Sequence, residues 1–156
     1  HPEEAYFVPP IKERLDTGDL VNYSNDVWVI VTPRCDLARP ENIDTILLAR
    51  CEDISIKWSK LEANEGKSKN KEMQKLIQHD GSLKQHFLNP MRDSTGQNKG
   101  PWMVQFHNVK TLPAASALEE LLKSRFASLS PLFIPSLVER FGAYYSRIGT
   151  PNYSNF

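Results

Sequence analysis

The chain has 156 residues, the length of one ordinary domain, and 40% of them are hydrophobic, which is enough to form a packed core. Its 19 Lys and Arg residues balance 19 Asp and Glu residues, and a net charge of zero disfavours a general nucleic-acid binder. No segment approaches the roughly 20 apolar residues of a membrane span, and no signal-peptide pattern is present, so we expect no membrane partner.

Residues 1–16 are predicted to be a linker, because Pro2, Pro9 and Pro10 favour extended backbone. The chain begins with His1 rather than Met, and we interpret residues 17–151 as one α+β domain at the end of a longer protein, with a tail over 152–156. The expected partners are therefore other domains of that longer chain or separate proteins.

Three strands are predicted over residues 20–23, 27–32 and 45–51. In the second strand Val27, Val29 and Val31 alternate with Trp28 and Ile30, so both of its faces are apolar. The third strand repeats this pattern, with Ile46 and Leu48 on one face and Leu47, Ala49 and Cys51 on the other. Strands of this kind are covered on both sides, so the pair is expected at the centre of a small sheet or barrel.

The two cysteines are predicted to stay free. If residues 27–32 and 45–51 pair as an antiparallel hairpin, Cys51 lies near Val27 and Cys35 lies near Ile43, at the opposite end of the ladder. That separation, on the order of 25 Å, excludes a disulfide or a shared metal site. Free thiols are typical of a reducing compartment, so we expect a cytoplasmic protein without a metal or a cofactor.

Cys35 and Asp36, at the end of the second strand, are the candidate reactive centre. Arg34 lowers the pKa of a neighbouring thiol and Asp36 raises it, so the two effects partly cancel. A nucleophilic thiol also needs a base, for which the candidates are His79, His86 and His107. The alternative, which we favour, is a structural turn in which Asp36 accepts backbone hydrogen bonds and Cys35 is buried.

The middle of the chain is predicted to begin extended over residues 52–60, where Ile54, Ile56 and Trp58 alternate. A helix is expected over 71–79, then a short strand over 83–88 that carries His86 as an interior histidine. Residues 91–100 are expected to form a polar loop. Lysines at 57, 60, 67, 69, 71 and 75 are interpreted as a solvated surface, with a phosphate-binding surface as the alternative.

The last third is predicted to contain a strand over 101–107, a bent or bulged continuation to 112, and a helix over 114–123. Trp102, Val104 and Phe106 share one face of that strand, and His107 lies on the more polar face. A long C-terminal helix starts near Ser130-Pro131 or Pro135 and ends at Gly149. Its apolar stripe, which is expected to cover the sheet, consists of Phe133, Leu137, Phe141, Tyr144 and Ile148. Arg125, Arg140 and Arg147 lie off this stripe. Together with Arg34 they are candidate anion-binding residues, with surface or carboxylate-paired arginines as the commoner alternative.

Two resemblances extend these expectations. Gly18-Asp19, followed by a strand that ends in Val31-Thr32-Pro33, resembles the start of the MazF/PemK-type toxin barrels, small SH3-like folds with terminal helices. The chain lacks the basic surface of those RNA-cutting toxins and has Cys35-Asp36 in place of their polar loop. The stretches VTPRCDLA and LVERFGAYYSRIGTP are similar to an uncharacterised bacterial domain with a Cys-Asp strand-end motif, which is attached to signalling modules in defence-type proteins.

The expected fold is thus α+β: a small antiparallel SH3-like (PemK-like) barrel or curled sheet with a long C-terminal helix packed on it. Three functions remain open. The first is a non-catalytic sensing or interaction module of a bacterial signalling or antiphage protein, which the neutral charge and the lack of a reaction motif favour. The second is a toxin-like (PemK-like) nuclease acting on RNA or DNA, which needs Arg34, His86 or His107 and an arginine to converge on one groove. The third is a thiol enzyme that uses Cys35.

Overall fold

The computed structural model describes residues 5–64, 67–78 and 82–149. Seven strands form one sheet in the order β1-β9-β2-β3-β4-β8-β5, and every pairing within it is antiparallel. The strands are β1 (Tyr6–Phe7), β2 (Asp19–Tyr23), β3 (Asp26–Ile30), β4 (Thr45–Asp53), β5 (Gln85–Leu88), β8 (Trp102–Pro113) and β9 (Arg125–Leu129). Among the described strands, β1 and β5 remain unpaired edges, so the α+β class is confirmed and a closed barrel is not formed.

The central hairpins follow the sequence prediction. Ser24 and Asn25 have φ of 51° and 65°, as the two central residues of a type I′ turn require, and they join β2 to β3. β3 pairs with β4 so that Val27 lies opposite Cys51, as predicted. Both strands are central in the sheet and buried on both faces.

Two separate cores cover the two faces of the sheet. One contains Val29, Ala49 and Val104 together with residues of helix α5 (Ile134–Gly149), of which Leu137 and Phe141 are buried. Phe141 packs edge-on against Phe106, with the two ring centroids 5.4 Å apart, which confirms that the C-terminal helix lies on the sheet. The side chain of Ile148, the last member of the predicted stripe, lies outside the described residues. The second core packs Trp28, Ile30, Ile46 and Leu48 against helix α4 (Ala114–Ser124).

Strand β8 is long and bulged, which confirms the bent continuation predicted for residues 108–112. Ala49 of β4 pairs with Val109, but the next residue, Arg50, pairs with Gln105. Residues 106–108 are therefore extra on the β8 side, and they bend the strand. This bend places His107 at the surface.

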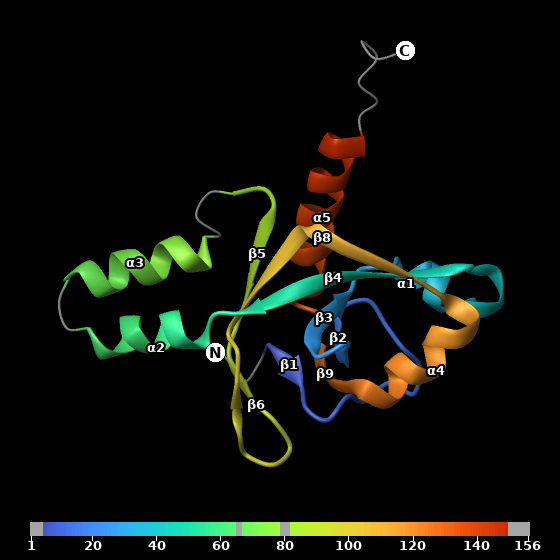
Figure 1. The fold of residues 1–156 in the computed structure, drawn as a ribbon, viewed down its shortest axis with the longest axis horizontal. Helices are drawn as coiled ribbons and strands as arrows, with labels where there is room; N and C mark the ends of the chain where they lie inside the picture. Colours follow the sequence, from blue (N-terminus) through green and yellow to red (C-terminus); the bar gives the residue numbers. More distant parts are fainter. Residues whose placement is uncertain (1–4, 65–66, 79–81, 150–156) are drawn as a thin grey trace, which may run out of the picture.

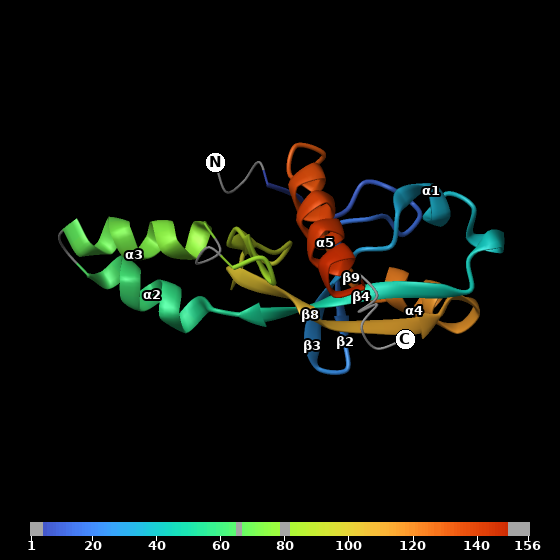
Figure 2. The same cartoon turned by 90° about the horizontal axis from the view of Figure 1, so that it is seen from above.

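A helical arm projects from one end of the sheet (Figures 1 and 2). It consists of α2 (Ser55–Ala63) and α3 (Lys67–Ile77), which lie side by side, whereas α1 (Arg34–Leu37) and α4 lie at the other end. The prediction of an extended segment over 52–60 is wrong beyond Asp53, where β4 ends. Ile54, Trp58 and Leu61 recur at helical spacing, so they share one face of α2. That face packs against Leu76, Phe87 and Met103. Asp53 Oδ1 accepts the Ser55 N–H at 2.8 Å, which satisfies one donor of the first turn.

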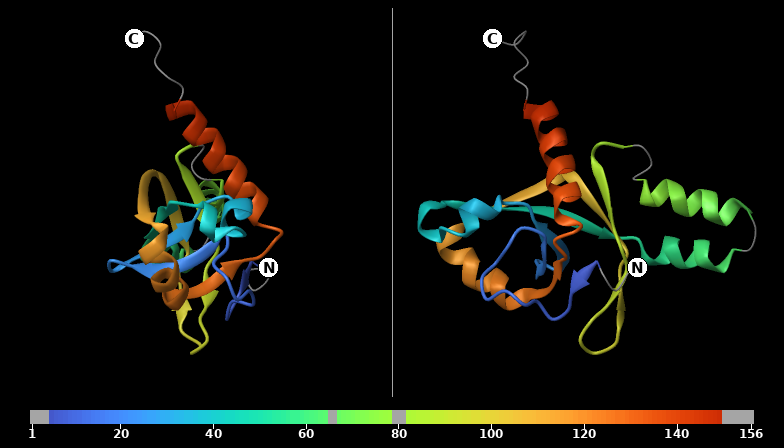
Figure 3. Two further views of the ribbon diagram at one scale, coloured as in Figure 1. Left: turned by 90° about the vertical axis from the view of Figure 1, so that its right-hand side faces the viewer. Right: turned by 180° about the vertical axis from the view of Figure 1, so that it is seen from behind.

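Three further segments differ from the sequence prediction. Residues 91–100 contain a small hairpin, β6 (Met91–Arg92) and β7 (Asn98–Lys99), which extends away from the sheet on the side opposite α5 (Figure 3). The predicted linker also contributes to the fold, because β1 pairs with β9, and Ala5, Tyr6 and Leu15 are buried. Strand β9 was not predicted at all, since it follows α4 without an intervening turn.

Candidate functional site

Cys35 lies on the surface, contrary to the expectation of a buried cysteine. It belongs to α1 (Arg34–Leu37), a single helical turn between β3 and β4 that begins directly after Pro33. Its sulfur lies 3.9 Å from Asp36 Oδ1, and Asp36 is exposed as well. Leu37 is the buried residue of this turn and anchors it to the second core.

The sheet register separates His86 from this thiol. Thr32 bonds to Leu47 near the start of β4, and Cys35 lies beyond Thr32, outside that end of the sheet. His86 pairs with Val104, which pairs with Cys51 near the other end of β4. Leu47 and His86 are therefore on the order of 15 Å apart, because four residues along β4 and two strand spacings lie between them. His86 is buried, as predicted, with its ring stacked on Phe106 at 6.1 Å. His107 is exposed in the β8 bulge, and His79 lies outside the described residues.

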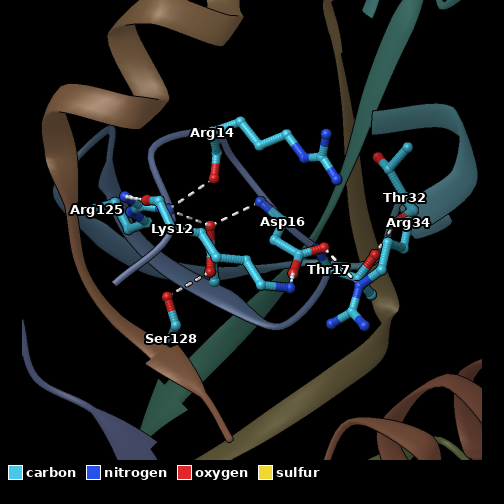
Figure 4. A network of polar contacts seen from close by, with 9 residues as sticks. Lys12, Arg14, Asp16, Thr17, Thr32, Arg34, Arg125 and Ser128 are labelled. Atoms are coloured by element: carbon cyan, nitrogen blue, oxygen red, sulfur yellow. Dashed lines mark hydrogen bonds and ion pairs between the residues drawn. The ribbon is translucent and has the colours of Figure 1, made fainter. Parts of the chain in front are cut away.

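A polar network fixes the segment before β2 (Figure 4). Asp16 and Asp19, both almost fully buried, are its two carboxylates. Asp16 accepts hydrogen bonds from Arg34 Nε at 2.9 Å and Lys12 Nζ at 2.7 Å, and Asp19 accepts them from Arg125 Nη1 at 3.0 Å and the Ser128 hydroxyl at 2.7 Å. Arg125 also donates to the backbone carbonyls of Lys12 and Arg14. The network therefore ties residues 12–19 to both β9 and α1.

The pKa values of the two carboxylates are shifted in opposite directions. For Asp16, burial alone raises the pKa, but the hydrogen bonds and charges of Lys12 and Arg34 outweigh burial and lower the pKa below its usual value. For Asp19, burial is the larger effect and raises the pKa despite the hydrogen bonds from Ser128 and Asp16 N–H and the charge of Arg125. Every charge of this network has a partner of opposite sign, so the arrangement is that of a structural clasp.

Three of the four arginines expected to bind anions are engaged within the fold. Arg34 and Arg125 are occupied by Asp16 and Asp19. Arg140 of α5 donates to the backbone carbonyls of Ser82 and Gln85, and burial lowers its pKa. Arg147 is exposed in the last turn of α5. Arg34 directly precedes Cys35 in α1, and Arg140 bonds to the carbonyl of Gln85, the residue before His86.

A cleft of about 630 Å³ lies elsewhere on the protein, and we call it the α2 cleft. One wall is a face of helix α2, on which residues 55, 58, 59 and 62 recur at helical spacing. The opposite wall is formed by Met91 and Arg92 of β6 with Asn98 of β7, and Tyr6 of β1 borders the cleft. Sequence reasoning missed this site because it treated residues 52–60 as extended, which hides the helical spacing of Ser55, Trp58, Ser59 and Glu62.

The walls of the α2 cleft combine aromatic side chains with polar side chains. Trp58 is half-buried and packs against Phe87 at 5.4 Å. The Tyr6 hydroxyl donates to the Asn89 carbonyl at 2.7 Å, so this ring is a fixed part of the wall. Within the part of the chain that the structure describes, neither the Glu62 carboxylate nor the Arg92 guanidinium makes an ion pair or a side-chain hydrogen bond. These groups are free to contact a bound molecule.

Among the described residues, no group of three or more His, Cys, Asp or Glu side chains is placed to hold a metal ion. None of the helices in that same part of the chain has the length and apolar character needed to cross a membrane. The chain matches no family model, and comparisons with curated proteins and with solved structures find no match.

Proposed function

We propose that this chain is a non-catalytic sensing or interaction module of a bacterial signalling or antiphage-defence protein, and that the α2 cleft is its ligand site. The cleft carries the proposal: its volume of about 630 Å³ lies within the range of ligand sites, roughly 300–1,000 Å³. Its lining combines the apolar and aromatic side chains Trp58, Tyr6 and Met91 with polar side chains that include Glu62 and Arg92, and side chains of both kinds contact ligands in such sites.

The two catalytic alternatives receive less support from the geometry. A thiol enzyme needs a base within hydrogen-bonding distance of the Cys35 sulfur, but the sheet register separates His86 from that sulfur. A toxin-like nuclease needs basic side chains that converge on one groove, and Arg34 and Arg125 are held by Asp16 and Asp19. A binding function requires neither arrangement.

We also propose that the fold is related to the SH3-like barrels and that the protein works in the cytoplasm. The order β9-β2-β3-β4-β8 is compatible with a curled sheet, and α4 connects β8 to β9, the two strands that would have to approach to close it. Free thiols at both Cys35 and Cys51 favour a reducing compartment.

The ligand site can be tested by two-dimensional amide NMR with a panel of amino acids, tripeptides and 5′-mononucleotides as probes. We expect chemical-shift changes that cluster on Ser55, Ser59, Asn98 and Gly100, because these residues line the cleft. Ser59→Trp fills the cleft and should abolish the changes, whereas Ser116→Trp, at an exposed position of α4, should leave them intact. Cys35→Ser should also leave them intact.

The proposal is wrong if no probe shifts the cleft residues, or if the changes cluster around Cys35 and disappear in Cys35→Ser. Both tryptophan variants should keep the amide dispersion of the unmodified protein, because both positions are exposed.

A further inference from the structure

We propose that the α2 cleft binds an extended peptide segment that carries a basic side chain and a carboxylate. This inference rests on the proposed binding function and specifies the ligand class. It follows from the placement of opposite charges on the two walls of one cleft.

The basic side chain would lie on the α2 wall. Trp58 and Glu62 are four residues apart on the same helix and both line the cleft, so they lie about 6 Å apart along the helix axis. A tryptophan ring attracts a cation placed over it, and a carboxylate beside it completes an ion pair with the same cation. An arginine or lysine side chain is the group in a peptide that satisfies both.

The carboxylate would bind at the opposite wall. Arg92 of β6 faces the cleft, and a guanidinium binds a carboxylate through two parallel hydrogen bonds. Asn98 of the paired strand β7 lies on the same wall and offers an amide donor. The same Glu62 that favours a cation disfavours a phosphate-rich ligand, so the cleft suits a peptide better than a nucleic acid.

The dimensions agree with a short extended segment. The α2 wall runs from Ser55 to Glu62, whose positions are seven helical rises or about 10 Å apart. Three to four extended residues span the same length at about 3.3 Å each. The hydroxyl groups of Ser55, at one end of this wall, and of Ser59, in its middle, can bond to the peptide backbone.

The test is an NMR titration with acetyl-Arg-Ala-Ala-Asp-amide and with its neutral analogue acetyl-Gln-Ala-Ala-Asn-amide. We expect the charged peptide to bind at the cleft at least about fivefold more tightly, and the difference to shrink at high salt. Glu62→Gln and Arg92→Gln should each weaken the binding of the charged peptide by about three- to tenfold and leave the affinity for the neutral peptide unchanged. Glu119→Gln, at an exposed position of α4 outside the cleft, is the matched control and should change neither affinity.

Equal affinity for both peptides, or insensitivity of the charged peptide to Glu62→Gln and Arg92→Gln, would overturn this inference. In either case, binding that still maps to the cleft and is lost in Ser59→Trp would leave the binding function standing. Binding of a mononucleotide at the cleft without any peptide would likewise reject the peptide and keep the function. If no probe reaches the cleft, both proposals fail together.

Discussion

Arg125 Nη1 lies 3.0 Å from Asp19 Oδ2, and the two residues are separated by 106 positions in the chain. Only 9% of the Arg125 side chain and 1% of the Asp19 side chain are exposed. Arg125 is the first residue of β9 and lies opposite Val21, whereas Asp19 is the first residue of β2 and lies opposite Ser128, so this ion pair links the two antiparallel strands diagonally. The same guanidinium holds the backbone of Lys12 and Arg14.

Arg125→Ala is expected to destabilise the protein by about 3–5 kcal/mol, because it leaves the Asp19 carboxylate buried without its cation. It also releases residues 12–14 from β9. Urea denaturation followed by circular dichroism measures the loss. Arg147→Ala is the control, since Arg147 is exposed, and should stay within about 0.5 kcal/mol of the unmodified protein. A small effect of Arg125→Ala would show that the clasp contributes little to stability.

Asp16 should make the stability depend on pH in the acid range. Lys12 and Arg34 lower the pKa of Asp16 in the folded state. The stabilisation that the ionised Asp16 carboxylate provides is therefore complete above its unfolded-state pKa of about 3.9, and it is lost as the pH falls through the lower folded-state pKa. Asp16→Asn should therefore flatten the acid limb of the stability profile below about pH 4. Asp36→Asn, at an exposed carboxylate, should leave that limb unchanged. A profile of Asp16→Asn parallel to that of the unmodified protein would contradict the assignment.

The sequence predicts the parts of this fold whose patterns are local. Val27, Val29 and Val31 alternate with Trp28 and Ile30, and the two sets enter the two separate cores as expected. The spacing of Leu137, Phe141 and Tyr144 likewise predicts the helix that covers one face. In each case a single period decides between strand and helix over several residues.

The sequence does not predict the features that depend on distant partners. The ion pair of Asp19 with Arg125 requires β9 to return beside β2. Helix α4 ends at Ser124 and β9 begins at the next residue, Arg125, so no turn residue marks the change from helix to strand. The α2 cleft has walls from three separated segments, and the alternation of Ile54, Ile56 and Trp58 favours a strand until packing against Phe87 and Leu76 selects the helix. Ile56, the residue that fits only the strand pattern, is 75% exposed.

The two thiols should react at very different rates. Cys35 is exposed, whereas Cys51 is 3% exposed in the first core and burial raises the pKa of its thiol. With an aromatic disulfide reagent at pH 8, we expect one thiol to be titrated in the native protein and two in guanidinium chloride. Cys35→Ser should eliminate the native reaction and shift the unfolding midpoint little, since Cys35 is outside the cores. Two fast thiols in the native state would show that the β3–β4 core opens.

Gly100→Ala should destabilise the edge of the cleft. Gly100 has φ of +70°, and an added Cβ would lie 2.7 Å from the ring of Trp102, a residue that is 1% exposed. The left-handed backbone and the clash together should cost about 2–4 kcal/mol. Gly142→Ala is the matched control, since Gly142 lies within α5 and, apart from its chain neighbours and the backbone of its own helix, no atom of the described residues lies within 4 Å of its added Cβ. This variant should gain up to about 1 kcal/mol from helix propensity. Thermal unfolding of both variants measures the two effects, and equal midpoints would refute the packing described for Gly100.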